Sequence, residues 1–252
     1  MARSVVAPSV QPRVFPAGRA LLLLAIGASQ MAGRRFSIEG RRVQAVRFGR
    51  LALAIGYVDA AQFGPEELAR NREQVAWLRT EARLHERAVE RAAVLGPVLP
   101  ARLLSVHPTL GALEAYAKEQ YARWSRALTR LGTRREYAVH LFRGPHAPPG
   151  SESYLFRVSA RATRGGRAAV PRVDSPVAEE LSKLQRACSE GPSATRRVAA
   201  DVRRGELFAS ALLLDQAQSA SLKTTLQGLS TAGGALGLTY YLEGPRAPFS
   251  FF

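Results

Sequence analysis

The sequence is short of the residues that build disulfides and metal sites. Its 252 residues include one cysteine, Cys188, so an intrachain disulfide and a Cys-rich metal site are both excluded. A single thiol suits a reducing compartment, and we expect a cytoplasmic protein. No two of the four histidines stand at H-x-H or H-x-x-x-H spacing, which leaves a zinc site without support.

Long apolar runs are absent too, since none reaches the roughly 18 residues that a membrane-spanning helix needs. The apolar run Ala20–Ala28 has two interpretations. It is either the core of a signal peptide, because arginines precede it, or a buried first strand. Three prolines lie upstream and no small-x-small cleavage site follows, so we favour the strand.

Lysine and acidic residues are scarce, whereas arginine is abundant. Of 36 basic residues only three are lysine, and with 20 acidic residues the net charge is +16. Such a surface can bind nucleic acid, an anionic membrane face or an acidic partner, but no block of like charges stands out. The best nucleic-acid candidate is Arg34–Arg50, where Phe36 and Phe48 stand among arginines. The alternative for this stretch is a solvated hairpin edge.

Catalytic motifs are missing as well. Cys188 ends a predicted helix without a local base, so we expect an inert thiol. The glycines Gly233, Gly234 and Gly237 precede a strand rather than a helix, which indicates a turn and not a phosphate-binding loop. The chain has only four aspartates. Two carboxylates that act as a catalytic acid and base could therefore come together only through the fold. We expect no enzyme, no metal and no cofactor.

Each histidine has an ordinary structural explanation. His85 lies on the apolar stripe of a predicted helix, and we expect a core histidine that is hydrogen-bonded to the backbone. His107 precedes a proline and a helix, as a loop or cap residue does. His140 falls on the less apolar face of a predicted strand, where a surface contact is conceivable, and His146 lies in a proline-rich loop.

The hydrophobic period changes along the chain between two and about 3.6 residues, which predicts a mixture of strands and helices. The predicted strands are 20–28, 43–48, 51–58, 98–106, 136–142, 207–215 and 236–243. The predicted helices are 68–92 (one helix or a pair), 110–131, 177–188, 194–203 and 222–229. Hairpins and few regular βαβ units favour an α+β fold.

This pattern predicts two domains after a disordered arm, residues 1–18. The N-terminal domain, 19–107, has the order strand, hairpin, helices, strand, which suits a modified ferredoxin-like fold without one crossover helix. The C-terminal domain, 108–252, is a small α/β domain of helices on a sheet, and it includes an extended tail, 245–252.

The last seventeen residues, Leu236–Phe252, are the most distinctive stretch. An alternating strand runs into Gly244-Pro245, which we expect to end it, and Pro248, Phe249, Phe251 and Phe252 follow. Chain ends are usually polar and frayed unless they are tied down. We therefore predict that the tail is docked on its own protein or on a partner, with the head of Arg246 in water or against an acidic group.

The tail resembles the close of the gas vesicle F/L proteins (GvpF/GvpL), which read roughly G-P-W-P-P-Y-S-F where this chain has GPRAPFSF. Three further stretches are similar to the family in the same order: His85–Val106, Arg135–Phe142 and Ser153–Val158. The family-motif positions are His85, Pro100, Arg102, Glu136, Tyr154, Gly244, Pro245, Pro248, Phe249 and Phe251. The chain departs from the family at Leu103 for Phe, His140 for Lys and Arg246 for Trp, as a divergent member would.

The resemblance implies a role without a reaction. Members of the family are needed to build gas vesicles, hollow protein shells that give cells buoyancy, and they contact the major shell protein and other accessory proteins. It implies an assembly or minor structural protein of the cytoplasm and the gas vesicle, with no membrane or small-molecule partner. A basic nucleic-acid-binding α+β protein is the alternative, and a small-molecule-binding ferredoxin-like module is a third hypothesis.

Overall fold

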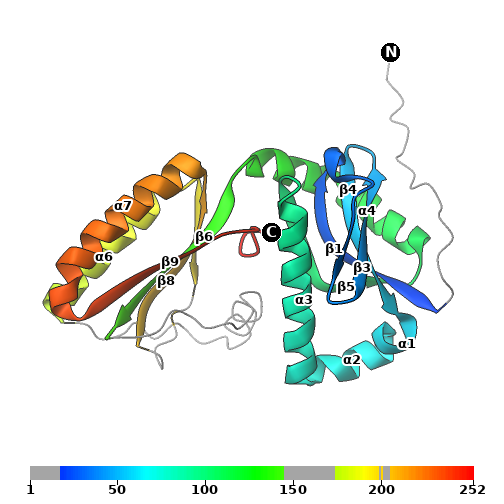
Figure 1. Cartoon of the computed structure of the whole chain (residues 1–252), viewed down its shortest axis with the longest axis horizontal. Helices are drawn as coiled ribbons and strands as arrows, with labels where there is room; N and C mark the ends of the chain where they lie inside the picture. The colour runs from blue at the N-terminus through cyan, green and yellow to red at the C-terminus, as the bar shows by residue number, and fades with distance from the viewer. Residues whose placement is uncertain (1–17, 145–173, 199, 201–204) are drawn as a thin grey trace, which may run out of the picture. The chain divides into compact units, whose positions relative to one another are not determined.

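The computed structural model describes residues 18–144, 174–198, 200 and 205–252. The expected disordered arm, apart from Gly18, and the motif position Tyr154 lie outside these residues. The chain divides into two compact units, the first ending at Gly132 and the second covering Thr133–Phe251 (Figure 1). Each unit is described by itself.

The first unit is built on a five-stranded antiparallel sheet of order β2-β3-β4-β1-β5. Its strands are β1 (Arg19–Ala28), β2 (Arg35–Ile38), β3 (Arg41–Phe48), β4 (Leu51–Asp59) and β5 (Val98–His107). Its helices are α1 (Ala60–Phe63), α2 (Pro65–Glu73), α3 (Val75–Ala93) and α4 (Leu110–Leu131), with a 3-10 turn η1 (Ser29–Met31). The strand predicted at Ala20–Ala28 is confirmed as β1.

Helices α3 and α4 cover opposite faces of this sheet. Glu81 of α3 forms an ion pair with Arg41 of β3, with Nη1 and Oε2 2.8 Å apart. Tyr121 of α4 packs against Phe48 of the same strand, with ring centroids 6.0 Å apart. Arg41 and Phe48 are an odd number of residues apart, and side chains alternate along a strand, so the two helices lie on different faces.

Coverage of both faces has two consequences. Strand β1 is buried on both sides, which explains why its sequence is continuously apolar instead of alternating. Helix α4 packs on β1 and β5 and so belongs to the first unit. The unit therefore ends at Gly132, and not at His107 where the sequence placed the boundary.

The second unit has a four-stranded antiparallel sheet of order β7-β8-β6-β9. Its strands are β6 (Arg135–Arg143), β7 (Ala194–Val198), β8 (Glu206–Leu214) and β9 (Leu238–Arg246). Its helices are α6 (Ser175–Glu190) and α7 (Gln216–Gly233), followed by a 3-10 turn η3 (Gly234–Leu236). The helix predicted at 194–203 was wrong over Ala194–Val198, because backbone pairing with β8 holds β7 as a strand, and most of the remainder lies outside the described residues.

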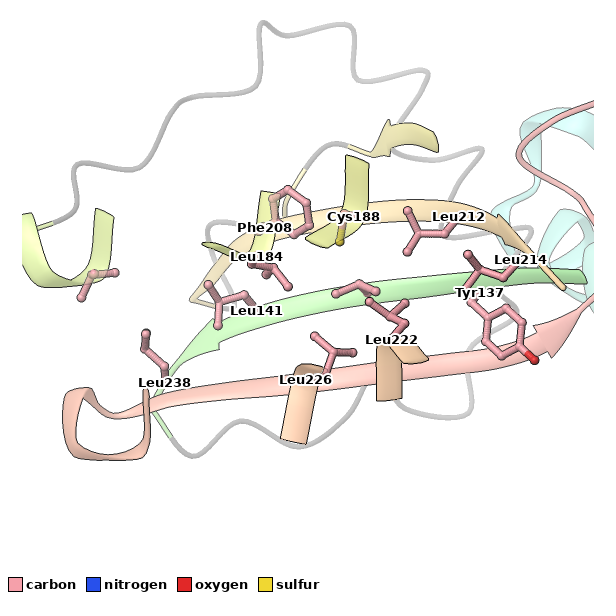
Figure 2. Close-up of a cluster of buried hydrophobic side chains, with 12 residues drawn as sticks. Tyr137, Leu141, Leu184, Cys188, Phe208, Leu212, Leu214, Leu222, Leu226 and Leu238 are labelled. Carbon is pink, nitrogen blue, oxygen red and sulfur yellow. The ribbon is translucent and has the colours of Figure 1, made fainter. Parts of the chain in front are cut away.

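Helices α6 and α7 lie side by side on one face of this sheet (Figure 1). Figure 2 shows the apolar cluster between them and the strands. Its members are Tyr137, Val139, Leu141, Val177, Leu184, Cys188, Phe208, Leu212, Leu214, Leu222, Leu226 and Leu238. Burial in this cluster raises the pKa of the Cys188 thiol to about 12. The thiol therefore stays protonated near pH 7 and is inert, as the sequence predicted.

Strand β9 does not end at Gly244 as predicted, but continues to Arg246. Opposite β6 the pairing is Glu243 with Ala138 and Arg246 with Glu136, so two residues of β9 face one residue of β6. This is a β-bulge, and it takes Pro245 out of the hydrogen-bond ladder at the sheet edge, where proline is tolerated. The Gly244–Pro245 peptide bond is cis.

Candidate functional site

The face of the second sheet opposite α6 and α7 carries buried charged groups. Glu136 and His140 of β6 alternate with Tyr137, Val139 and Leu141 of the apolar cluster, so they point away from the helices. Around them lie two sets of side chains. We call Glu136, Arg196 and Ser250 the tail anchor, and His140, Glu206, Glu243 and Arg246 the histidine clasp.

The tail anchor fixes the C-terminal segment to the sheet. The backbone N–H of Ser250 donates to Oε2 of Glu136 at 2.8 Å, and the Ser250 hydroxyl donates to Oε1 at 2.7 Å. The carbonyl oxygen of Ser250 accepts from the Arg196 guanidinium on β7. The tail thus passes from β9 to Glu136 on the neighbouring strand β6, where the side chain of Arg196 reaches it from β7. The prediction of a docked tail is confirmed, and the docking partner is the protein's own sheet.

The histidine clasp links the central strand β6 to both of its neighbours. His140 Nδ1 lies 2.6 Å from Oε1 of Glu206 on β8, and His140 Nε2 lies 3.6 Å from Oε2 of Glu243 on β9. Burial lowers the pKa of His140, but hydrogen bonds and charges from the two carboxylates outweigh it and raise the pKa overall. Arg246 Nη2 completes the clasp, 2.5 Å from Glu243 Oε1, so the guanidinium meets an acidic group as expected.

The position of His140 corrects the expectation drawn from the sequence. A strand face that carries Glu136, Ala138 and His140 is typical of a face in water, and for that reason the sequence suggested a surface contact for His140. All three residues are buried. The polar face of this strand is an interior one, where Glu136 bonds to the tail and His140 faces carboxylates of the two neighbouring strands.

His85 of α3 is the other buried histidine, at 1% exposure. The core position is confirmed, but neither ring nitrogen makes a hydrogen bond of ordinary geometry to any residue that the structure describes. Burial lowers the pKa of His85 to about 4, with an opposing contribution from the Ala101 backbone and a further lowering by Arg41. His85 therefore stays neutral near pH 7, against the segment of β5 that bears Pro100 and Arg102.

We expect His85→Leu to make the first unit less sensitive to acid. Between pH 6.5 and about 4 the unfolded chain protonates this imidazole and the folded chain does not. The unfolded state then binds more protons, so stability falls as the pH drops, by about 3 kcal/mol at most. Urea unfolding followed by tryptophan fluorescence across this range measures the effect. Val94→Ser is the control, because Val94 is exposed and does not titrate; if His85→Leu has the wild-type pH dependence, the explanation fails.

The described motif positions fall into two groups, one in each unit. His85, Pro100 and Arg102 lie together where α3 meets β5. In the second unit the structure brings Glu136 next to the end of β9 and to the tail. That group comprises Glu136, Gly244, Pro245, Pro248, Phe249 and Phe251. Phe249 is buried and Phe251 half-buried. The importance of these positions to the family stays a prediction.

Sequence reasoning missed the partners of these residues. Glu206 stands directly before the apolar strand 207–215. An acidic residue next to a buried strand was the one sequence feature that could have indicated a buried partner for His140. Ser250 lies inside the tail motif but looks like an ordinary turn residue. Nothing in the sequence marks Arg196, because its role depends on the pairing of β7 with β8.

The described residues give little support to metal binding, membrane insertion or nucleic-acid binding. They hold no group of three His, Cys, Asp or Glu side chains arranged to bind a metal ion. None of their helices is long and apolar enough to cross a membrane. In the hairpin considered for nucleic acid, Phe48 is fully buried against Tyr121 and Arg41 is paired with Glu81, so neither side chain is open to a base or a phosphate.

Comparison with known proteins agrees with this fold. The family model described as gas vesicle synthesis protein GvpL/GvpF matches residues 23–252. Gas vesicle protein L of Streptomyces sp. (strain CB03234) is 28% identical over 231 residues, covering 85% of this chain and 84% of the relative.

Two solved structures show the same fold. The crystal structure of GvpF from Anabaena sp. PCC7120 has a TM-score of 0.63 at 12% identity and covers 92% of this chain and 97% of its own. GvpF from Microcystis aeruginosa has a TM-score of 0.60 at 13% identity, covering 92% and 98%. Because the family model spans nearly the whole sequence, this chain belongs to the GvpL/GvpF family of gas vesicle synthesis proteins.

Proposed function

We propose that this protein acts in gas vesicle assembly, or as a minor part of the vesicle, by binding the major shell protein and other gas vesicle proteins. Membership of the GvpL/GvpF family over residues 23–252 is the observation that carries the proposal. The charged groups of the tail anchor and the histidine clasp support a structural role rather than a reaction, because they bond to the tail or to one another.

We also infer that the first unit is a ferredoxin-like sheet that lacks one crossover helix. Strands β5, β1, β4 and β3 are adjacent in that order, which is the order of a ferredoxin-like sheet. The short turn η1 and strand β2 stand where the first helix of that fold would cross. Helix α4 covers the face of this sheet opposite α3.

The end of the tail is the part we expect to touch a partner. The tail anchor holds the backbone at Ser250. Phe251 and Phe252 therefore follow a residue whose position is fixed. Phe251 is half-buried and Phe252 is 43% exposed. Burying one exposed Phe side chain stabilises a complex by roughly 1.5–3 kcal/mol. A fixed backbone also reduces the entropy lost on binding.

Two deletions test this role. Removal of 245–252 takes away the tail and its anchor, and we expect it to weaken binding to the major shell protein while the first unit still folds. Removal of Phe251 and Phe252 alone leaves the Ser250 N–H and hydroxyl on Glu136, so it should cost less stability than loss of the whole tail, about 1–2 kcal/mol for the half-buried Phe251. Binding should still weaken about tenfold, the effect of one lost contact of about 1.4 kcal/mol.

Binding to purified shell protein and vesicle formation in cells are the measurements. Val94→Ser is the matched control, because Val94 is an exposed apolar residue, at 73%, outside the tail. If both deletions bind and assemble as well as the full chain, the tail is not the contact. Retention on nucleic acid at physiological salt, with no binding to the shell protein, would instead favour the nucleic-acid alternative.

A further inference from the structure

We propose that the histidine clasp is a proton-controlled fastening that holds strand β9, and with it the C-terminal tail, on the second sheet. The proposal concerns how the tail is attached and stands apart from what the tail binds. Among the strands that the structure describes, β9 lies at the edge of the sheet and pairs with β6 alone. A side-chain link between β6 and β9 therefore bears directly on whether β9 stays in place.

The clasp combines one hydrogen bond from the ring with one longer ionic contact that lies beyond hydrogen-bond range. His140 lies between the carboxylates of Glu206 and Glu243, with Nδ1 2.6 Å from one and Nε2 3.6 Å from the other. A neutral imidazole carries a single N–H and can donate to one carboxylate only, whereas the imidazolium donates from both nitrogens. Protonation therefore decides whether the ring attracts Glu243 as well as Glu206.

Charged groups lie on this face on every strand of the sheet. The described ones are Glu136 on β6 with Arg134 just before that strand, Arg196 on β7, Glu206 on β8, and Glu243 and Arg246 on β9. The carboxylates of Glu206 and Glu243 are the charged groups that contact the His140 ring. Loss of the proton from a buried ring between two carboxylates removes both ionic contacts, which is costly at a buried site.

The sign of the pH dependence follows from the direction of the shift. Glu206 and Glu243 together raise the pKa of His140 above its ordinary value of 6.5, against the effect of burial. A raised pKa in the folded state means that the clasp stabilises the sheet fully below about pH 6.5. That stabilisation is lost as the pH rises through the folded-state pKa. Above it, β9 keeps its backbone ladder, its apolar packing under α7 and the tail anchor, but not the ionic contact of the clasp.

Amide hydrogen exchange of the full chain, resolved for residues 238–250, tests the proposal. After correction for the intrinsic chemical rate, opening of these amides should increase between pH 6.5 and pH 9. The increase should be about tenfold for each unit by which folding raises the pKa. His140→Gln should already be open at pH 6.5 and show no such increase. His107→Gln, which changes a histidine of the first unit, should behave like the wild type.

The proposal is overturned if His140→Gln keeps the wild-type pH dependence, or if the wild type shows none. Should His140→Gln fail to fold, an NMR titration of the histidine rings in the wild-type protein decides the matter. The His140 ring should lose its proton above pH 6.5 and after His107, whose pKa burial lowers. Loss of the His140 proton below 6.5 would refute a clasp that depends on the imidazolium.

Discussion

Replacement of Glu136 by alanine is expected to detach the C-terminal tail and to lower the free energy of unfolding of the second unit by about 3 kcal/mol. The Glu136 side chain is fully buried and accepts both the N–H and the hydroxyl of Ser250. Hydrogen bonds to a charged group contribute about 1.5–3 kcal/mol each, and their loss leaves buried donors without a partner. The expected loss is smaller than the sum because the released tail can be hydrated.

Two observables separate loss of the tail from general damage. Amides 247–251 should lose exchange protection in Glu136→Ala, while amides in the middle of β6 and β8 keep theirs. Ser250→Ala should have a smaller effect, about 1 kcal/mol, because the backbone N–H of residue 250 still donates to Glu136. Glu190→Ala is the control, since Glu190 is an exposed carboxylate at the end of α6. A tail that stays protected in Glu136→Ala would show that the anchor does not hold it.

Local patterns in the sequence predicted the long elements because each has a strong period of its own. Strand β1 is a continuous apolar run, and α4 has a stripe of apolar residues at helical spacing over its whole length. The stripe shows that α4 packs against something, but it does not say on which sheet. The sequence therefore suggested a boundary at His107, whereas the first compact unit runs to Gly132.

Short edge strands and buried charge could not be predicted in the same way. Strands β2 and β7 are four and five residues long, and each is paired with one neighbour among the described strands. Glu136 and His140 alternate with apolar residues, which indicates a face in water. The resemblance to the gas vesicle family marked Glu136 and the tail separately, but only the fold showed that the carboxylate binds Ser250.

Gly244 is the position where a single methyl group is expected to do most damage to the same region. It lies in the β9 bulge with a φ of 127°, a backbone conformation that side chains with a Cβ rarely adopt. A Cβ there would lie 2.8 Å from the backbone oxygen of Glu136 and 3.0 Å from Cδ1 of Tyr137. Backbone atoms of the central strand cannot move aside cheaply, and those of Glu136 also carry the tail anchor.

We therefore expect Gly244→Ala to destabilise the second unit by about 3–4 kcal/mol, of which backbone strain accounts for roughly 1–3 kcal/mol and steric overlap for the rest. Gly228→Ala is a matched control, for which we expect the opposite change in stability. Gly228 is exposed in α7, and a Cβ at this position would meet no atom within 4 Å, so alanine should stabilise the helix by up to about 1 kcal/mol. Exchange of β6 and β9 amides measures the second unit, because Trp77 and Trp124 report only on the first. Equal stabilities of the two variants would mean that β9 can adopt another path past Glu136, and that the bulge does not position the tail.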